Sequence, residues 1–300
     1  MARAILITQG GPIGAGVLAG MLQAGIEIAE IWGLRSGYRT TRRFAPGWDV
    51  TRLAERNRIG VFHNPRLRGW TGAAERIAER RADLLVTAMT LHIVPRTMLE
   101  IFGRRAVNFH PALLPEYRGP TPIPGMLLDG RADACGGLTI HQLTPGIDEG
   151  PLIAQRAVPR ARLSYQAWLG RIAGAGHDLA LNDLPRYLEG SLDGTAQTPG
   201  SYCNVKAQLD LGAHINLETA RRLALLLGDT GRLTANRHRV RSLISVAGPP
   251  TGEPPRIDRR TVTLDLADVR ARFQRVNAWH DLSDRLGMLR ALRAIDRAQE

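Results

Sequence analysis

The residues best suited to chemistry in this sequence are Asn108, His110 and Asp148. Asn108 and His110 stand two apart at the end of an expected strand, Arg105–Phe109, so their side chains can project toward the same space. Asp148 lies in a turn, Thr144–Gly150, that can bring its carboxylate against the imidazole. The carboxylate would raise the pKa of His110, and the imidazolium and the Asn108 amide would both donate to a developing oxyanion. With Asp148 relaying the proton lost by an attacking amine, the set predicts acyl transfer.

A histidine near the end of a strand is, by itself, more often structural than catalytic. Here the surrounding sequence favours a catalytic role for His110. Residues 108–119 fit N-x-H-x-x-x-L-P-x-x-x-G, and residues 137–155 contain T-I-H followed by D-x-G and a glutamine. Both segments closely resemble the folate-dependent formyltransferase family, which includes glycinamide ribonucleotide, methionyl-tRNA and nucleotide-sugar N-formyltransferases. The resemblance extends over residues 3–190.

The resemblance implies a formyl-transfer domain with 10-formyltetrahydrofolate as donor, an amine as acceptor and no metal. Asn108, His110 and Asp148 take the family's catalytic positions. In the family, the pterin of the donor lies between the loop after the fourth strand and the loop that carries the aspartate. His92 departs from the aliphatic residues common in the first of these loops. The donor-binding residues expected here are Met89, Thr90, Leu91, Ile93, Val94, Leu143, Pro145, Gly146 and Ile147.

The acceptor is expected beside Tyr117, Arg118 and Gly119, where Arg118 either meets a phosphate or is a solvated surface arginine. Gly14 and Gly16 follow the first expected strand in a G-x-G-x-x-A pattern. They fit three interpretations: a tight turn that lets a helix approach the sheet, a helix N-terminus that binds an anionic group of the acceptor, and a dinucleotide site. No acid follows the second strand to hold a ribose, which counts against the dinucleotide.

The remaining histidines and the cysteines do not indicate a metal site. His141 lies within an expected strand and is interpreted as structural. Cys135 and Cys203 are far apart and are expected to be small buried apolar residues. The histidines without recognisable ligand spacing are His63, His177, His214, His238 and His280.

Apolar segments of strand length alternate with helical segments through the first 190 residues. This order predicts an α/β fold, a Rossmann-like and mostly parallel sheet with helices on both faces. Strands are expected at Arg3–Thr8, Ile26–Leu34, Ile59–His63, Ala82–Ala88, Arg105–Phe109, Gly137–Leu143 and Pro151–Val158. Helices are expected after a glycine loop, Gln9–Gly16, and over Gly72–Arg81, Pro95–Phe102 and Tyr165–Leu188.

We expect residues 1–190 to form the catalytic domain, 191–200 a linker rich in glycine, serine and proline, and 201–300 a smaller α+β accessory domain. The accessory domain would serve substrate or dimer contact, because its tail has an apolar face. Asn216 caps a helix through Leu227, and Asp281–Ala298 is the tail helix. A hairpin is expected between Arg239–Val246 and Arg260–Leu266.

These few strands do not make the five-stranded barrel that methionyl-tRNA enzymes carry at this end. Arg118-Gly119-Pro120-Thr121-Pro122-Ile123 nevertheless resembles the R-G-x-x-P-I of the tRNA enzymes. We therefore expect the amine of a small molecule, an amino sugar nucleotide or a secondary metabolite, as the acceptor, with methionyl-tRNA as the alternative.

The net charge of +12 and the isoelectric point near 11.0 suggest an alternative of another class, a basic nucleic-acid-binding protein whose Rossmann-like domain is not catalytic. The excess is spread along the chain, and every basic residue except Lys206 is arginine, so a coding bias explains it equally well. The chain has no apolar run of membrane length and no secretory signal, so we expect a cytoplasmic protein.

Overall fold

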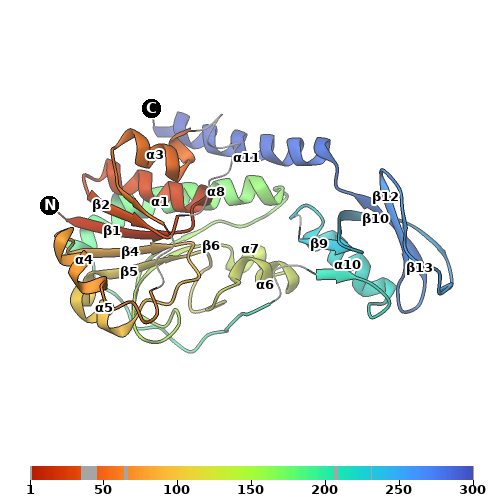
Figure 1. The fold of residues 1–300 in the computed structure, drawn as a ribbon, viewed down its shortest axis with the longest axis horizontal. Coiled ribbons are helices and arrows are strands. Elements are labelled where there is room, and N and C mark those ends of the chain that lie inside the picture. The colour runs from red at the N-terminus through yellow and green to blue at the C-terminus, as the bar shows by residue number, and fades with distance from the viewer. Residues whose placement is uncertain (1, 35–45, 64–66, 206–208, 231, 300) are drawn as a thin grey trace.

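The computed structural model describes residues 2–34, 46–63, 67–205, 209–230 and 232–299. The lone lysine, Lys206, lies outside them. Two sheets form the frame of the molecule: a seven-stranded sheet in the N-terminal part and a six-stranded sheet in the C-terminal part (Figure 1). The strand order of the first, β3-β2-β1-β4-β5-β6-β7, has its reversal between β1 and β4, and the carboxyl ends of strands at such a point commonly carry a site.

The first sheet is mostly parallel, which confirms the expected fold class. Its first five strands run parallel, β6 runs antiparallel to β5, and β7 runs antiparallel to β6. The central strands are buried along nearly their whole length because helices cover both faces, which explains their continuous apolar sequences. The strands are β1 (Arg3–Thr8), β2 (Glu27–Trp32), β3 (Val61–Phe62), β4 (Leu84–Ala88), β5 (Ala106–His110), β6 (Gly137–Gln142) and β7 (Leu152–Ala157).

Helices cover the two faces of this sheet and enclose two separate apolar clusters (Figure 1). One face carries α1 (Gly11–Gln23), η1 (Pro46–Trp48), α3 (Val50–Arg56), α8 (Tyr165–Asp178), η3 (Leu179–Asp183) and α9 (Leu184–Leu188). The other carries α4 (Ala73–Glu79), α5 (Arg96–Phe102) and η2 (Gly103–Arg105). The single helix expected over Tyr165–Leu188 is continuous except for a π-helical segment at η3. Two short helices, α6 (Pro122–Leu128) and α7 (Ala132–Cys135), follow β5.

The expected glycine loop is shorter than Gln9–Gly16, because α1 already begins at Gly11. Gly16 lies inside the helix, where a Cβ atom would stand 2.1 Å from the carbonyl oxygen of Ala173 in α8. A Cβ on Gly14 would stand 2.6 Å from Thr8 Oγ1. Both glycines are buried and allow close packing of α1, which fits the first of the three interpretations, and acceptor binding by Gly14 and Gly16 stays a prediction.

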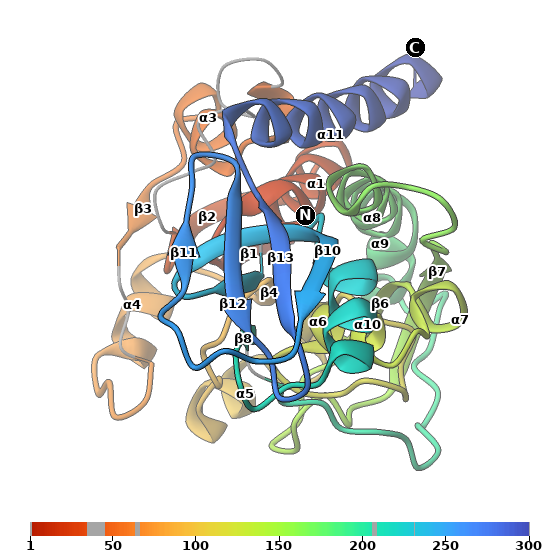
Figure 2. The ribbon, with the colours of Figure 1, turned by 90° about the vertical axis from the view of Figure 1, so that its right-hand side faces the viewer.

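The C-terminal sheet has the order β11-β12-β13-β10-β9-β8 and is seen face-on in Figure 2. The expected pairing of Arg239–Val246 with Arg260–Leu266 is wrong, because β13 lies between the two segments and pairs with both. The arginines of β13 alternate with Ala271 and Phe273, which are fully buried, so a strand was hidden within a charged sequence. The elements are β8 (Leu209–Leu211), α10 (Leu217–Leu227), β9 (Leu233–Ala235), β10 (His238–Gly248), β11 (Arg256–Ile257), β12 (Thr261–Asp265) and β13 (Arg270–Arg275).

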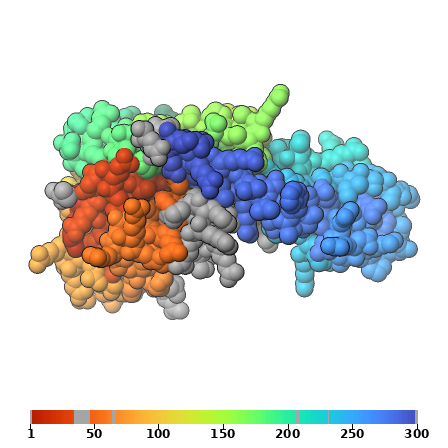
Figure 3. Space-filling model, turned by 90° about the horizontal axis from the view of Figure 1, so that it is seen from above, coloured from red at the N-terminus to blue at the C-terminus, as the bar shows by residue number. Residues whose placement is uncertain are grey.

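The tail helix α11 (Ala278–Gln299) leaves the second sheet and lies on the outer side of α8 (Figures 1 and 3). Leu289 and Leu292 are buried there, and Ile295 packs against the backbone of α8 at Gly174. The apolar face expected for the tail therefore packs largely within the chain. No helix of the described residues is long and apolar enough to cross a membrane.

Candidate active site

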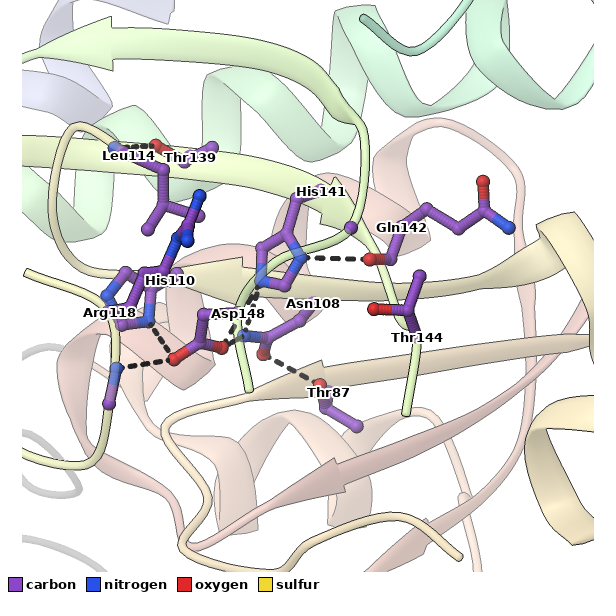
Figure 4. A network of polar contacts seen from close by, with 12 residues as sticks. Thr87, Asn108, His110, Leu114, Arg118, Thr139, His141, Gln142, Thr144 and Asp148 are labelled. Carbon is purple, nitrogen blue, oxygen red and sulfur yellow. Dashed lines mark hydrogen bonds and ion pairs between the residues drawn. The ribbon is translucent and has the colours of Figure 1, made fainter. Parts of the chain in front are cut away.

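Two neighbouring strands of the first sheet place three polar side chains on one face. Asn108 and His110 alternate on β5, and the antiparallel register sets His141 of β6 directly opposite Asn108. In Figure 4 these side chains and Asp148 converge. Cross-strand neighbours in such a pair have Cβ atoms about 5 Å apart, so this register is what brings the two histidines and the amide together.

Asp148 is the centre of this group. Its Oδ2 accepts a hydrogen bond from the Gly119 backbone N–H at 2.8 Å and lies 3.4 Å from His110 Nδ1. Its Oδ1 lies 3.3 Å from Asn108 Nδ2 and 3.4 Å from His141 Nε2. The backbone of Asp148 has φ 54°, a left-handed conformation that non-glycine residues rarely adopt and that is frequent at functional sites.

The orientation of the Asn108 amide follows from its neighbours. Thr87 Oγ1 donates to Asn108 Oδ1 at 2.7 Å, which leaves Nδ2 facing Asp148 and His141. A flipped amide would put Oδ1 against the carboxylate, which is repulsive. The two Nδ2 hydrogens therefore point to His141 Nε2 at 3.0 Å and to the longer contact with Asp148.

His141 belongs to this group, in contact with Asn108 and Asp148. Its Nδ1 donates to the carbonyl oxygen of Gln142 at 2.9 Å, because a carbonyl can only accept. In the neutral imidazole, Nε2 is then an acceptor and receives the Asn108 amide hydrogen. The cross-strand position opposite Asn108 was the signal in the sequence, and it required the β5–β6 register to be known.

His110 is buried, and its two ring nitrogens have different partners. Nε2 donates to the carbonyl oxygen of Tyr117 at 2.8 Å, and Nδ1 faces Asp148. Burial lowers the pKa of His110 below its ordinary value, and this effect exceeds the opposing effect of the Asp148 carboxylate. The expectation of a raised pKa is wrong because full burial penalises the imidazolium more than one carboxylate stabilises it. His110 is thus neutral at pH 7, with the Nδ1 lone pair free to take a proton.

The carboxyl of Asp148 stays ionised. Burial alone would raise the pKa of Asp148, but the neighbouring His141 and His110 side chains and the Gly119 N–H outweigh burial and lower the pKa to about 2. An ionised carboxylate beside a neutral imidazole is an arrangement that can receive a proton. Among the described residues, no three histidine, cysteine or acidic side chains gather into a metal site.

The residues expected to bind the donor fall into three groups. Met89, Leu91, Ile93 and Ile147 are exposed apolar side chains on the loops that follow β4 and β6. Val94 is buried in the apolar cluster that also contains residues of α4 and α5, and Leu143 packs against that cluster. Both residues therefore anchor the loops to the core. Thr90 accepts the His92 backbone N–H at 3.1 Å and shapes the first loop, whereas Pro145 and Gly146 form the turn before Asp148.

The residues expected beside the acceptor are less available than predicted. The Tyr117 side chain is buried and its hydroxyl donates to Asp129, so only its backbone carbonyl reaches the site, through His110. Arg118 does not present its guanidinium as a free phosphate ligand, because Nε and Nη2 donate to Gln197 Oε1 at 3.1 and 2.8 Å. Gly119 contributes its backbone N–H to Asp148.

The Gly/Ser/Pro-rich segment after α9 lies along the site rather than apart from it. Arg118 N–H donates to Ser201 O at 2.9 Å and Cys203 N–H donates to Arg118 O at 2.7 Å. The ring of Tyr202 lies over Gly119, where a Cβ atom would stand 2.8 Å from Tyr202 Cε2. This ring is 57% exposed and is the aromatic face next to Asp148's hydrogen-bond donor, a residue that sequence reasoning missed.

Comparison with known proteins identifies the class to which this fold and site belong. The model of the formyl transferase family matches residues 2–178, so the chain belongs to the folate-dependent formyltransferase family. It is 35% identical over 142 residues to methionyl-tRNA formyltransferase of Listeria innocua and 37% identical over 152 residues to that of Halorhodospira halophila. These matches cover 47% and 50% of the chain but only 45% and 47% of the relatives. The chain thus spans about half the length of the curated relatives it matches.

Solved structures extend the similarity. Glycinamide ribonucleotide transformylase 1 from Symbiobacterium toebii has a TM-score of 0.51 and 26% identity, covering 63% of this chain and 89% of that one. WlaRD, a sugar 3N-formyl transferase described in the presence of dTDP and 5-N-formyl-THF, has a TM-score of 0.58 at 15% identity, covering 92% of this chain and 98% of that one. The second similarity shows that a related fold continues through the C-terminal sheet.

Proposed function

We propose that this protein transfers a formyl group from 10-formyltetrahydrofolate to the amine of a small molecule. The observation that carries the proposal is the Asp148 carboxylate, which accepts from Asn108 Nδ2 and the Gly119 N–H and lies 3.4 Å from His110 Nδ1. Acyl transfer to an amine needs a proton acceptor and a donor to the developing oxyanion close together, and this group supplies both.

The roles follow from the hydrogen-bond partners. His110 Nε2 is committed to Tyr117 O, so a proton arriving from the amine is held between His110 Nδ1 and Asp148 Oδ2, 3.4 Å apart. Asn108 Nδ2 donates to the oxyanion by giving up its longer contact, the one of 3.3 Å to Asp148. His141 keeps the amide in place by accepting its other hydrogen.

The two loops beside this group fit a folate. Met89, Leu91, Ile93 and Ile147 expose apolar side chains that suit a flat heterocycle, and the surrounding backbone can meet its polar edge. Two structural neighbours, WlaRD and the N-formyltransferase from Helicobacter canadensis, were solved with 5-N-formyl-THF and folinic acid. When bound, the folate supplies the formyl group, and the chain's residues orient it and move the proton.

The charge arrangement of the C-terminal sheet favours a small acceptor over tRNA. Arg239 pairs with Asp281, Arg241 with Asp284 and Arg256 with Asp258. The largely buried Arg270 pairs with Asp265 at 2.8 Å. Phosphate binding depends on arginines whose charge is not already neutralised. The four arginines named above are each paired with a carboxylate of the same chain. Tyr202 offers a face on which a sugar ring or a base could pack.

Methionyl-tRNA is the second candidate acceptor. It is favoured by the 35–37% identity to methionyl-tRNA formyltransferases in the catalytic part of the chain. Too few C-terminal strands do not count against this acceptor, because the described residues form a six-stranded sheet there and the expectation of only a hairpin is wrong.

The test is an acceptor screen with 10-formyltetrahydrofolate, following tetrahydrofolate release by absorbance. A nucleotide-linked amino sugar, free amines of several classes and methionyl-tRNA are offered in parallel. We expect turnover with a small amine and at least about a hundredfold lower rate in the Asn108→Ala enzyme, since one oxyanion donor is worth roughly that factor. If methionyl-tRNA is the only acceptor that is formylated, the result supports the second candidate and contradicts the small-molecule proposal. Folate binding with no transfer to any amine would refute both.

A further inference from the structure

Gln197 has every hydrogen-bonding position of its amide engaged by the loops that form the site. Its Nε2 donates to the carbonyl oxygens of Asp148 at 2.9 Å and of Gly150 at 2.6 Å. Its Oε1 accepts from Nε and Nη2 of Arg118. Two donors and two acceptors exhaust what a glutamine amide can offer, so its orientation is unique.

This amide joins the two loops whose separation decides the position of the Asp148 carboxylate. On one side it holds the backbone of Asp148, which has the uncommon φ of 54°. On the other it holds Arg118, the residue before Gly119, whose N–H donates to Asp148 Oδ2. A strained backbone persists only when its surroundings hold it, and Gln197 supplies such a support through the carbonyl oxygens of Asp148 and Gly150.

We propose that Gln197 is a positioning residue for formyl transfer: it fixes the Asp148 carboxylate against the Gly119 N–H and His110. The inference rests on the proposed function. It gives a catalytic reason for the segment 191–200, which by composition is only a linker. Thr195 supports the same placement, since its backbone pairs with Leu152 at 2.7 and 2.8 Å.

Two substitutions separate the contacts of Gln197. Gln197→Met keeps the length of the side chain and removes every hydrogen bond. Gln197→Glu keeps an acceptor for Arg118 but turns a carboxylate oxygen toward the carbonyl oxygens of Asp148 and Gly150. If the hydrogen bonds from Gln197 to the carbonyl oxygens of Asp148 and Gly150 are what matters, both variants lose formyl-transfer activity. This holds even though Gln197→Glu retains the pairing with Arg118. Gln274→Met is the matched control, a half-buried glutamine that accepts one hydrogen bond from Ser242 in the other sheet.

The first readout does not need an acceptor: hydrogen exchange of the Gly119 amide by NMR. We expect both Gln197 variants to exchange this amide at least about tenfold faster than the wild type and the control. The second readout is turnover. We expect kcat to fall about tenfold to a hundredfold while the dissociation constant of tetrahydrofolate stays within about twofold, because a misplaced carboxylate affects the transfer step and not donor binding.

The third readout is the pH profile of kcat, which a merely structural residue would leave in place. Asp148 is faced by His110 of β5 and His141 of β6 together with the Gly119 N–H. Its carboxylate raises the pKa of His110 against the effect of burial, so a carboxylate displaced from His110 should move the acidic limb of both variants to lower pH. Protection of Gly119 equal to the wild type, or faster exchange with kcat and the acidic limb unchanged, overturns the inference. A wild-type enzyme that transfers no formyl group overturns the proposed function itself. Loss of the fold in Gln197→Met, seen by circular dichroism, leaves Gln197→Glu to decide by the same measurements.

Discussion

At the carboxyl end of the first sheet, several polar groups face one carboxylate, that of Asp148, whereas two arginines of β10 in the second sheet each pair with a single carboxylate of α11. These pairs are Arg239 with Asp281 and Arg241 with Asp284. Convergence on a single buried carboxylate lowers its pKa to about 2 and holds a reactive group ready. Pairing neutralises charge and joins elements. The contrast teaches that the net charge of a region says little about its chemistry until the partners of each charge are known.

The largest expected difference in activity between the two regions comes from a substitution at His110. We expect His110→Ala to lower kcat for formyl transfer by about 10²–10⁴, because the proton acceptor beside Asp148 is lost. The matched change in the second sheet is Arg239→Gln, which removes an exposed ion pair worth about 0–1 kcal/mol and should leave kcat unchanged. Initial rates of tetrahydrofolate release measure both. Equal losses in the two variants would erase the distinction between the regions.

The pH dependence gives the next largest effect. The pKa of His110 is below 6.5 in the folded protein, so as pH falls below 6.5 the unfolded chain binds a proton that the folded one does not, and stability declines by up to about 1.4 kcal/mol per pH unit. Asp148 adds a second decline between pH 3.8 and about 2. We expect kcat to stay level through neutral pH and to fall only below 6.5, where His110 becomes protonated. Urea unfolding and rate profiles across pH 4–8 measure this, and an activity that rises on acidification would contradict a neutral His110.

Helix packing in the first sheet can be tested at Gly16. We expect Gly16→Ala to destabilise the protein by about 1–3 kcal/mol, because the new Cβ would meet the α8 backbone at Ala173. Gly47→Ala is the control, since a Cβ there meets nothing within 4 Å. Urea unfolding of both variants gives the free energies. A neutral Gly16→Ala would contradict the need for close packing of α1 on α8 at this position.

The smallest expected effect concerns the acceptor. We expect Tyr202→Ala to raise the KM of a small amine acceptor several-fold, since an aromatic contact is worth about 0.5–1.5 kcal/mol, and to leave the KM of the folate unchanged. Trp279→Ala on α11, which removes another exposed aromatic side chain, should change neither constant. A larger KM for the folate in Tyr202→Ala would place this ring on the donor side instead.

Sequence alone located the parts of the site that depend on local spacing. Asn108 and His110 alternate within one strand, and Asp148 follows in a motif, so no long-range contact was needed to find them. His141 escaped because its partner is 33 residues away across an antiparallel pair. Gln197 escaped because its Gly/Pro-rich surroundings have the composition of a linker, although its partners lie 47 to 79 residues earlier.

The elements of the fold also differ in whether local sequence predicts them. The buried strands of the first sheet are continuous apolar segments, so they were predictable, whereas β13 alternates arginine with buried residues and was not. The sign of the His110 pKa shift also depends on a quantity that sequence lacks, the degree of burial. Each error thus arose where a tertiary contact, rather than local composition, determines the outcome.

The central claim is that Asp148, held by Asn108 and the Gly119 N–H beside His110, carries the proton step of formyl transfer. The most direct measurement is the initial rate of tetrahydrofolate release for Asp148→Asn against the wild type, at saturating 10-formyltetrahydrofolate and acceptor. Asparagine keeps the shape and removes the charge. We expect a loss of about 10²–10⁴ in kcat with tetrahydrofolate binding intact. A rate within about threefold of the wild type would contradict the account.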